Sequence, residues 1–103
     1  MNNGNKFYIV VGFFDGTAHF LQMRGEINWF FYNNRLRTFK TKETAIRNAN
    51  KVLARYNVTE VRVYLCSEGD YLSCSAFQKY DTSDKRIVYT RKKGETAHNF
   101  INQ

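Results

Sequence analysis

TKETAIRNANKVLARYN, residues 41–57, carries the clearest helical period in this sequence. Its apolar residues recur at spacings of three and four, which places them on one face of an α-helix: Ala45, Ile46, Ala49, Val52, Leu53 and Tyr56. Thr41 stands at the N-cap position, with Glu43 in the first turn and Arg55 in the last, where both charges suit the helix dipole. A helix with one apolar face must pack on another layer, so we expect the β-like segments on either side to form a sheet beneath it.

The composition predicts one α+β domain over residues 1–103, with residues 1–5 and 95–103 as candidate flexible ends. Aromatic residues make up 17% of the chain and proline is absent, which is typical of a β-rich, well-packed domain. No apolar run approaches the roughly 18 residues of a membrane span. The N-terminal MNNGNK lacks the pattern of a signal peptide. We therefore expect a cytoplasmic protein with no membrane partner.

The segment KFYIVVGFF, residues 6–14, predicts a first strand, and the Asp15-Gly16 dipeptide after it favours a type I′ hairpin turn. The turn fixes the expected pairs as Phe14 with Thr17, Phe13 with Ala18 and Val11 with Phe20. We expect the helix to cover the face that holds Phe7, Ile9, Val11, Phe13, Ala18 and Phe20. The other face is also apolar, so it needs a cover from the C-terminal segment, a second copy in a homodimer or another partner; it holds Tyr8, Val10, Phe14, His19, Leu21 and Met23.

INWFFY, residues 27–32, predicts a third strand, and Asn33-Asn34 can turn the chain into a short return strand over residues 35–39. The pairing places Phe30, Tyr32, Arg35 and Arg37 on one face, and Trp29, Phe31 and Leu36 on the other. Aromatic rings beside guanidinium groups favour stacking of single-stranded bases. Aromatic strand residues are also typical of a core, and the sequence leaves both interpretations open.

After the helix, VTEVRVYLC, residues 58–66, alternates strictly, with Val61, Val63 and Leu65 on one side and Glu60, Arg62 and Tyr64 on the other. A turn centred on Glu68-Gly69 predicts a return strand that places Leu72, Cys74 and Ala76 on the side of Val61. That register points Cys74 into the core and Cys66 away from it, so we expect two unbridged thiols. Residues 85–90 predict a final strand and ETAHNFINQ a short tail helix. The expected antiparallel sheet has about five or six strands, three or four before the helix and two after it, and residues 85–90 are a candidate for one further strand.

The formal charge of +7 is concentrated in two stretches. Residues 35–62 hold eight basic and two acidic residues, a net charge of +6, and residues 79–93 hold six basic and two acidic residues, a net charge of +4. On the helix, Arg47, Lys51 and Arg55 recur every fourth residue opposite the apolar face, and no acidic residue interrupts them. This stripe predicts contact with an anionic partner, either nucleic acid (DNA or RNA) or an acidic protein surface. A solvated helix face is the alternative.

No motif predicts catalysis, a metal site or a cofactor site. Two cysteines are too few for a zinc site by themselves, and the C-x7-C spacing of Cys66 and Cys74 does not match a metal knuckle. His19 lies among apolar strand residues and His98 in a polar tail, and no nucleophile can be placed beside either one. There is no glycine-rich phosphate loop. We therefore expect a protein that is not an enzyme.

The segments FYIVVGFF, NWFFYNNRLRTF and KTKETAIRNANKVLARYN resemble, in size and style, the short accessory proteins of phages and mobile elements. Among these are the anti-CRISPR proteins that inhibit host nuclease complexes. The resemblance spans most of the chain and implies a stoichiometric inhibitor that blocks a surface. Many such inhibitors mimic DNA with acidic surfaces, and the charge of +7 departs from that pattern. The implied target is therefore nucleic acid or an acidic protein surface.

Two functional hypotheses follow. The first is a small basic protein that docks on a nucleic-acid-handling complex and inhibits a host defence nuclease. The alternative is a stand-alone nucleic-acid-binding module that uses the basic helix face and the neighbouring aromatic residues. Both predict the same partner-binding residues, which are Arg35, Arg37, Arg47, Lys51, Arg55, Phe30 and Tyr32.

Overall fold

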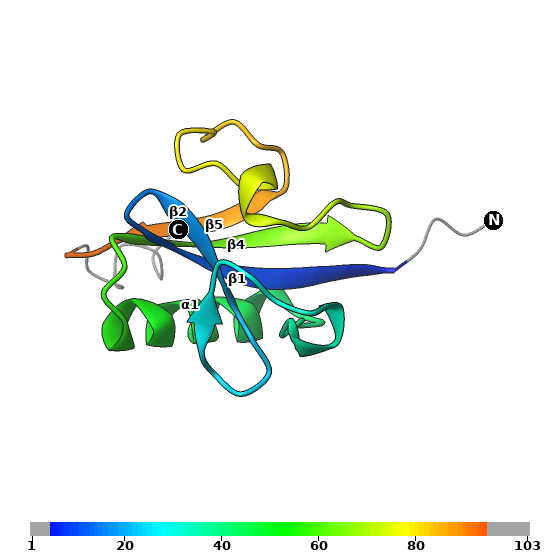
Figure 1. The fold of residues 1–103 in the computed structure, drawn as a ribbon, viewed down its shortest axis with the longest axis horizontal. Coiled ribbons are helices and arrows are strands. Elements are labelled where there is room, and N and C mark those ends of the chain that lie inside the picture. Colours follow the sequence, from blue (N-terminus) through cyan, green and yellow to red (C-terminus); the bar gives the residue numbers. More distant parts are fainter. Residues whose placement is uncertain (1–4, 95–103) are drawn as a thin grey trace.

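A five-stranded antiparallel sheet, with strand order β3-β2-β1-β4-β5, forms the centre of the computed structural model, which describes residues 5–94 (Figure 1). Helix α1 (Lys42–Arg55) lies along one face, and the long connection between β4 and β5 lies over the other. This arrangement confirms the predicted α+β class and the single main helix. The predicted tail helix lies outside the described residues, as do the predicted flexible ends apart from Asn5. The strands are β1 (Lys6–Phe14), β2 (Thr17–Leu21), β3 (Ile27–Asn28), β4 (Glu60–Ser67) and β5 (Ile87–Lys92).

The first hairpin forms in the predicted register. Its turn residues Asp15 and Gly16 have φ angles of 53° and 76°, the left-handed pair that a type I′ turn requires. The strand pairs are Val11 with Phe20, Phe13 with Ala18 and Phe14 with Thr17.

Helix α1 also begins and packs as predicted. The Thr41 side chain accepts a hydrogen bond from the backbone N–H of Thr44, at 3.3 Å, and caps the helix. The residues that α1 buries against the sheet are Ala45, Ala49, Val52 and Leu53.

The hairpin face under α1 is the opposite of the one predicted. The helix packs on a cluster that includes Val10, Leu21 and Val63, whereas Ile9 and Phe13 point to the other side of the sheet. Gly12 explains the choice, because a Cβ there would lie 3.0 Å from the Val58 side chain and 3.4 Å from that of Val52. A glycine on this face lets the end of α1 approach the sheet closely. The apolar face proposed for a homodimer is therefore buried within the chain at Val10 and Leu21.

The second face of the sheet is covered by the chain itself. Phe77, from the β4–β5 connection, is buried against Phe20 and Tyr64, with ring centroids 5.4 Å and 4.7 Å away. Leu36 and Leu72 pack on the same cluster. The sheet thus has one apolar cluster on each side.

The predicted return strand after β4 is wrong. The turn at residues 67–70 forms, with the N–H of Asp70 bonded to the carbonyl of Ser67 at 3.0 Å, but Cys74–Ala76 is a 3₁₀ turn, η2, and β5 pairs with β4 instead. Cys74 packs on the Tyr64 side of the sheet and is partly exposed, while Cys66 is fully buried, the reverse of the prediction. Serines at alternate positions make residues 71–76 a poor strand, whereas IVYTRK is rich in β-formers.

The predicted third strand ends early, at Asn28. Ile27 packs on the α1 side of the sheet, while Phe31 packs on the opposite side, with its ring centroid 4.8 Å from that of Phe20. A regular strand would put these two residues on the same face, so it must break between them. After the 3₁₀ turn η1 (Asn33–Arg35), Leu36 forms an isolated bridge with Gln22, the residue that follows β2, and Phe39 forms one with Tyr8 of β1.

Candidate functional site

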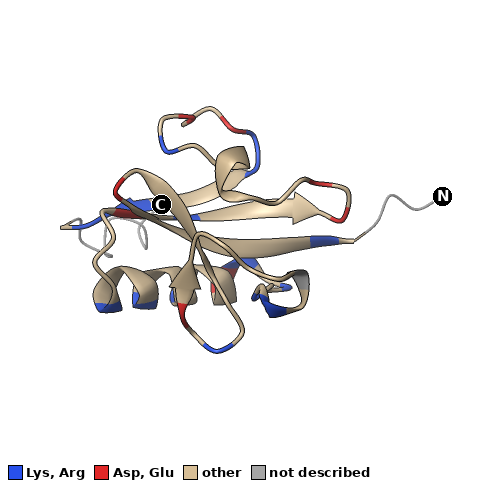
Figure 2. Cartoon of the chain, in the orientation of Figure 1, with Lys and Arg blue, Asp and Glu red and all other residues tan. Residues whose placement is uncertain are grey.

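The basic residues predicted on α1 lie on its solvent side. Arg47, Lys51 and Arg55 are all exposed, and Figure 2 shows basic residues along the helix and along the segment that leads into it. Arg47 is 3.4 Å from the Thr44 hydroxyl, and the Arg55 guanidinium lies 5.5 Å from the centre of the Tyr56 ring. Neither contact neutralises a charge, so α1 presents cations to solvent.

Arg37 joins this surface from outside the helix. It lines a shallow depression of about 80 Å³ together with Lys51 and Arg55, and no acidic residue lines it. We call these three residues the cationic depression. The Tyr56 hydroxyl donates a 2.6 Å hydrogen bond to the Gly25 carbonyl, which fixes the loop after β2 against the end of α1 and closes one side. The sequence predicted each cation, but only the tertiary structure brings Arg37 to the helix.

Phe30 and Tyr32 lie on the surface, which excludes the core alternative. Their side chains are 48% and 67% exposed, and their rings meet edge to face at 5.2 Å. Trp29 is 54% exposed and lies 5.8 Å from Phe30, so it belongs with them although the sequence had placed it on the opposite face. Because the segment is irregular, no periodicity could reveal this aromatic cluster of Trp29, Phe30 and Tyr32. Arg35 is exposed and lies close to this cluster in the sequence. The Arg37 guanidinium lies over the Phe39 ring, 5.0 Å from its centre, rather than over a ring of the aromatic cluster.

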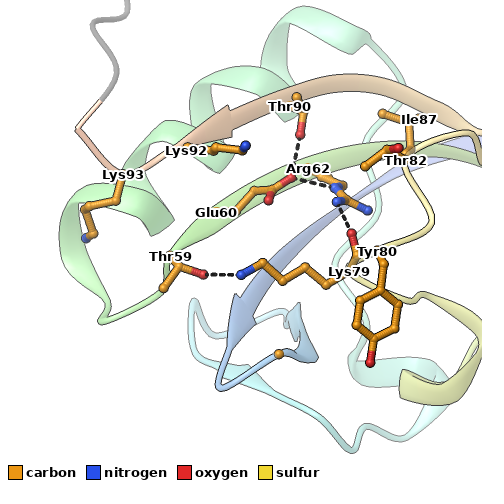
Figure 3. A pocket seen from close by; sticks show the side chains of 11 residues that line it. Thr59, Glu60, Arg62, Lys79, Tyr80, Thr82, Ile87, Thr90, Lys92 and Lys93 are labelled. Atoms are coloured by element: carbon orange, nitrogen blue, oxygen red, sulfur yellow. Dashed lines mark hydrogen bonds and ion pairs between the residues drawn. The ribbon is translucent and has the colours of Figure 1, made fainter.

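A larger hollow, which the sequence did not predict, lies on the face of the sheet opposite α1 (Figure 3). This groove has a volume of about 950 Å³ and runs between β4, β5 and the loop at residues 79–82. Glu60 and Arg62 form its floor, with the Arg62 Nε 2.7 Å from Glu60 Oε2. The Thr90 hydroxyl donates to the same oxygen at 2.9 Å. Glu60 and Arg62, two opposite charges on the same face of the otherwise largely apolar strand β4, are the sequence signal that could have located this groove.

Arg62 holds the loop over the groove. Its guanidinium donates to the Tyr64 hydroxyl at 3.1 Å and to the Gln78 carbonyl at 3.3 Å, and also to the Lys79 carbonyl, while it lies 4.7 Å from the centre of the Phe13 ring. Burial opposes the charge, but the hydrogen bonds to Tyr64 and Glu60 raise the pKa of Arg62 above its ordinary value. Burial also raises the pKa of the Tyr64 hydroxyl. The cation is therefore permanent.

A second arginine anchors the other end of the same connection. Arg86 binds Asp84 through two nitrogens, with Nη2 2.7 Å from Oδ2 and Nε 3.0 Å from Oδ1, and it donates to the Ala76 carbonyl at 3.2 Å. The guanidinium lies 4.4 Å from the centre of the Phe77 ring. These hydrogen bonds hold the pKa of the Asp84 carboxyl below its usual value. Arg86 and Asp84 therefore hold the connection in place, because the guanidinium and the carboxylate satisfy each other's charge and hydrogen bonds.

No known protein family, curated protein or solved structure matches this chain. Across residues 5–94, no three His, Cys, Asp or Glu side chains gather where they could hold a metal ion. His19 packs edge-on to Phe14 at 5.7 Å, and burial lowers the pKa of its imidazole. Within the same residues, no helix combines the length and the apolar character that a bilayer span requires.

Proposed function

We propose that this protein is a non-enzymatic, cytoplasmic binding protein that docks through the cationic side of α1 on an acidic surface of a nucleic-acid-handling complex. In this proposal it is encoded by a phage or mobile element and inhibits a host defence nuclease stoichiometrically. The observation that carries the proposal is the convergence of Arg37, Lys51 and Arg55 around one depression that no carboxylate lines.

The convergence supports binding because like charges held together repel one another and reduce stability. A helix face that serves only for solubility usually interleaves both signs, which lowers this cost. On α1, Glu43 lies in the first turn, and the three exposed cations Arg47, Lys51 and Arg55 follow without a carboxylate between them. An anionic partner would relieve the repulsion and hold the complex by electrostatic complementarity.

The inhibitor proposal is tested in cells. Phage plating is measured on a strain protected by a CRISPR nuclease, with and without expression of this protein. We expect expression to restore plating, and the double variant Lys51→Glu/Arg55→Glu to abolish the effect. The matched control is Lys6→Glu/Lys85→Glu, which reverses two exposed lysines away from α1 and lowers the formal charge by the same amount, from +7 to +3. If both double variants restore plating as well as the wild type does, α1 is not the docking surface.

The second candidate is a stand-alone nucleic-acid-binding module, and the exposed aromatic cluster favours it. Aromatic rings on a surface stack with unpaired bases, at about 1 to 3 kcal/mol per base, and nearby cations bind the phosphates. Both elements come from residues 29–55 of this chain.

Fluorescence anisotropy with single-stranded and duplex oligonucleotides at several salt concentrations tests the second candidate. If nucleic acid is the partner, the log-log salt slope should fall by about 0.7 to 0.9 for each phosphate contact removed in the Lys51 and Arg55 variants. Phe30→Ala/Tyr32→Ala should weaken single strands more than duplexes, since only unpaired bases stack on side chains. No binding to any oligonucleotide at low salt would reject this candidate and leave the inhibitor proposal intact.

A further inference from the structure

Exposed apolar side chains gather on one short segment of the chain. Four of the large apolar side chains that stay exposed among the described residues belong to residues 23–32: Met23 and the aromatic cluster. The Met23 N–H donates to the Arg35 carbonyl at 2.7 Å, and the Arg35 N–H donates to the Tyr32 carbonyl at 2.8 Å, so Met23 lies beside the segment that carries the rings. We call Met23 and the aromatic cluster the apolar patch. Single exposed apolar residues are ordinary, whereas a group of this size is typical of a contact surface.

The apolar patch is held in shape by the residues around it. Phe31, which lies between the exposed rings in the sequence, packs in the core with its ring centroid 4.8 Å from that of Phe20. Gln22 is only 6% exposed, and its Nε2 donates to the Phe30 carbonyl at 3.0 Å. A surface that is ordered before binding loses less conformational entropy when a partner docks on it. The patch therefore suits the role of a rigid anchor.

The loop after β2 joins the apolar patch to the cationic depression. Gly25 lines the depression, and its carbonyl accepts the hydrogen bond from the Tyr56 hydroxyl. Met23 lies two residues before Gly25, and two residues of extended chain span about 7 Å at most. The Gly25 N–H donates to the Gln22 carbonyl at 2.9 Å, which turns this loop back on itself. The two surfaces are therefore neighbours, and one partner can contact both.

The charge beside the patch calls for an anionic partner. Within residues 5–94, neither Arg35 nor any of the three cations of the depression forms an ion pair. The apolar side chains of Leu21 and Val52 also line the depression. Its volume of about 80 Å³ is well below the roughly 300 Å³ at which ligand pockets begin, so it admits one side chain rather than a whole small molecule. A carboxylate on a short methylene stem meets both the cations and the apolar lining.

The shape of the patch favours an apolar side chain over unpaired bases. The ring planes of Trp29 and Phe30 are inclined at 59°, and those of Phe30 and Tyr32 at 79°, so the three rings cannot all lie parallel to one stack of bases. Met23 has no ring on which a base could stack, but flexible methionine side chains are frequent on surfaces that bind peptides. Tryptophan, tyrosine and arginine are also the residues that dominate the energetics of protein–protein interfaces.

We propose that the apolar patch and the cationic depression together bind a peptide segment of a partner protein in which carboxylates flank a large apolar side chain. The apolar side chain packs on the rings and on Met23, and a carboxylate enters the depression. This inference rests on the proposed docking through the cationic side of α1 and names the kind of surface that the partner presents.

The proposal is tested by selection from a displayed library of random peptides of about 12 residues, which extend over roughly 40 Å and so reach both surfaces. We expect the intact chain to enrich sequences with Asp or Glu on both sides of Leu, Ile, Met or Phe. Selection on Phe30→Ala/Tyr32→Ala should keep the acidic residues and lose the apolar one, while selection on Lys51→Glu/Arg55→Glu should lose the acidic residues. No enrichment, or enriched sequences without carboxylates, would overturn the proposal.

One enriched peptide that lacks tryptophan is then titrated while the fluorescence of Trp29, the single tryptophan of the chain, is followed. Binding should move the Trp29 emission to shorter wavelengths, because the peptide shields the ring from water. Each of the two double variants should weaken the peptide at least about ten-fold, as the loss of central interface contacts does. The matched controls are Tyr71→Ala/Tyr80→Ala, which removes two rings that are 74% and 85% exposed on the β4–β5 connection, and Lys6→Glu/Lys85→Glu. Equal losses in the variants and their controls would overturn the assignment of the site.

Two further measurements separate this inference from the proposed function. If Phe30→Ala/Tyr32→Ala weakens single-stranded oligothymidylate and leaves the peptide unaffected, the patch stacks bases and the inference is overturned. If Phe30→Ala/Tyr32→Ala restores plating as well as the wild type does and Lys51→Glu/Arg55→Glu does not, the inference fails while the proposed docking through α1 stands. Peptide binding that both variants weaken, together with no effect of the wild type on plating, would support the inference and reject the inhibitor role.

Discussion

Arg62→Met should lower the free energy of unfolding by about 3 to 5 kcal/mol, because it removes the cation of a buried ion pair and leaves the carboxylate behind. Arg62 is 1% exposed and Glu60 is 4% exposed, so solvent screens the two charges little. Methionine keeps the unbranched apolar stem but lacks the guanidinium that lies over the Phe13 ring. The loss therefore combines the charge, its hydrogen bonds and the space that the guanidinium leaves.

The magnitude follows from the contacts. The Arg62 guanidinium donates to Glu60, to the Tyr64 hydroxyl and to the carbonyls of Gln78 and Lys79. Each buried acceptor left unpaired costs about 1 to 3 kcal/mol, and water that enters the groove can reach the two carbonyls, which lowers their share of the loss. The lost pair alone is a large fraction of the roughly 5 to 15 kcal/mol by which domains of this kind are stable.

Urea unfolding followed by circular dichroism measures the change, with Arg24→Met, a substitution of an exposed arginine, as the control expected to stay within about 0.5 kcal/mol of wild type. The double variant Glu60→Leu/Arg62→Met should recover much of the loss, because replacing both partners of a buried pair by apolar residues is often close to neutral. Limited proteolysis should also cut within residues 78–82 sooner in Arg62→Met. Wild-type stability in Arg62→Met would refute the role assigned to this arginine.

Three further predictions concern the core, the pH dependence and the thiols. Leu53→Ala should cost about 2 to 5 kcal/mol in the same urea assay, since Leu53 lies on the buried face of α1 and is 4% exposed; an unchanged midpoint would show that the helix packs differently. The Arg86 hydrogen bonds hold the pKa of Asp84 below its ordinary 3.8, so the stability they provide is present above pH 3.8 and is lost as the pH falls through the lower pKa of the folded state. Asp84→Asn should therefore be less stable than wild type at neutral pH, and the difference in stability should shrink in acid. A difference that does not change with pH would contradict this prediction. Burial raises the pKa of the Cys66 thiol to about 12, so Cys66 should react slowly with iodoacetamide in the folded protein. Mass spectrometry after brief treatment should find Cys74 modified and Cys66 unmodified, and both should be modified after unfolding. Early modification of Cys66 would show that its side of the sheet opens readily.

Local rules determined the elements that formed as predicted. The helix depends on spacings of three and four and on a cap at Thr41, all within 17 residues of sequence. The first hairpin depends on Asp15-Gly16, whose left-handed conformations fix the register of both strands. The exposed positions of Arg47, Lys51 and Arg55 follow from the same helical period. Neighbouring residues decide such features, so one sequence is enough to derive them.

The tertiary structure decided the choices between segments that the local pattern leaves equivalent. Both faces of the first hairpin are apolar, and the close approach of Val52 and Val58 to Gly12 selects the face that α1 covers. β5, and not the segment that follows the turn at residues 67–70, pairs with β4, and Phe77 at the end of that segment packs on the side of the sheet opposite α1. The groove and the cationic depression each combine residues far apart in the chain. Contacts of this kind depend on which layers meet in space, and residue spacing along the chain carries no record of that.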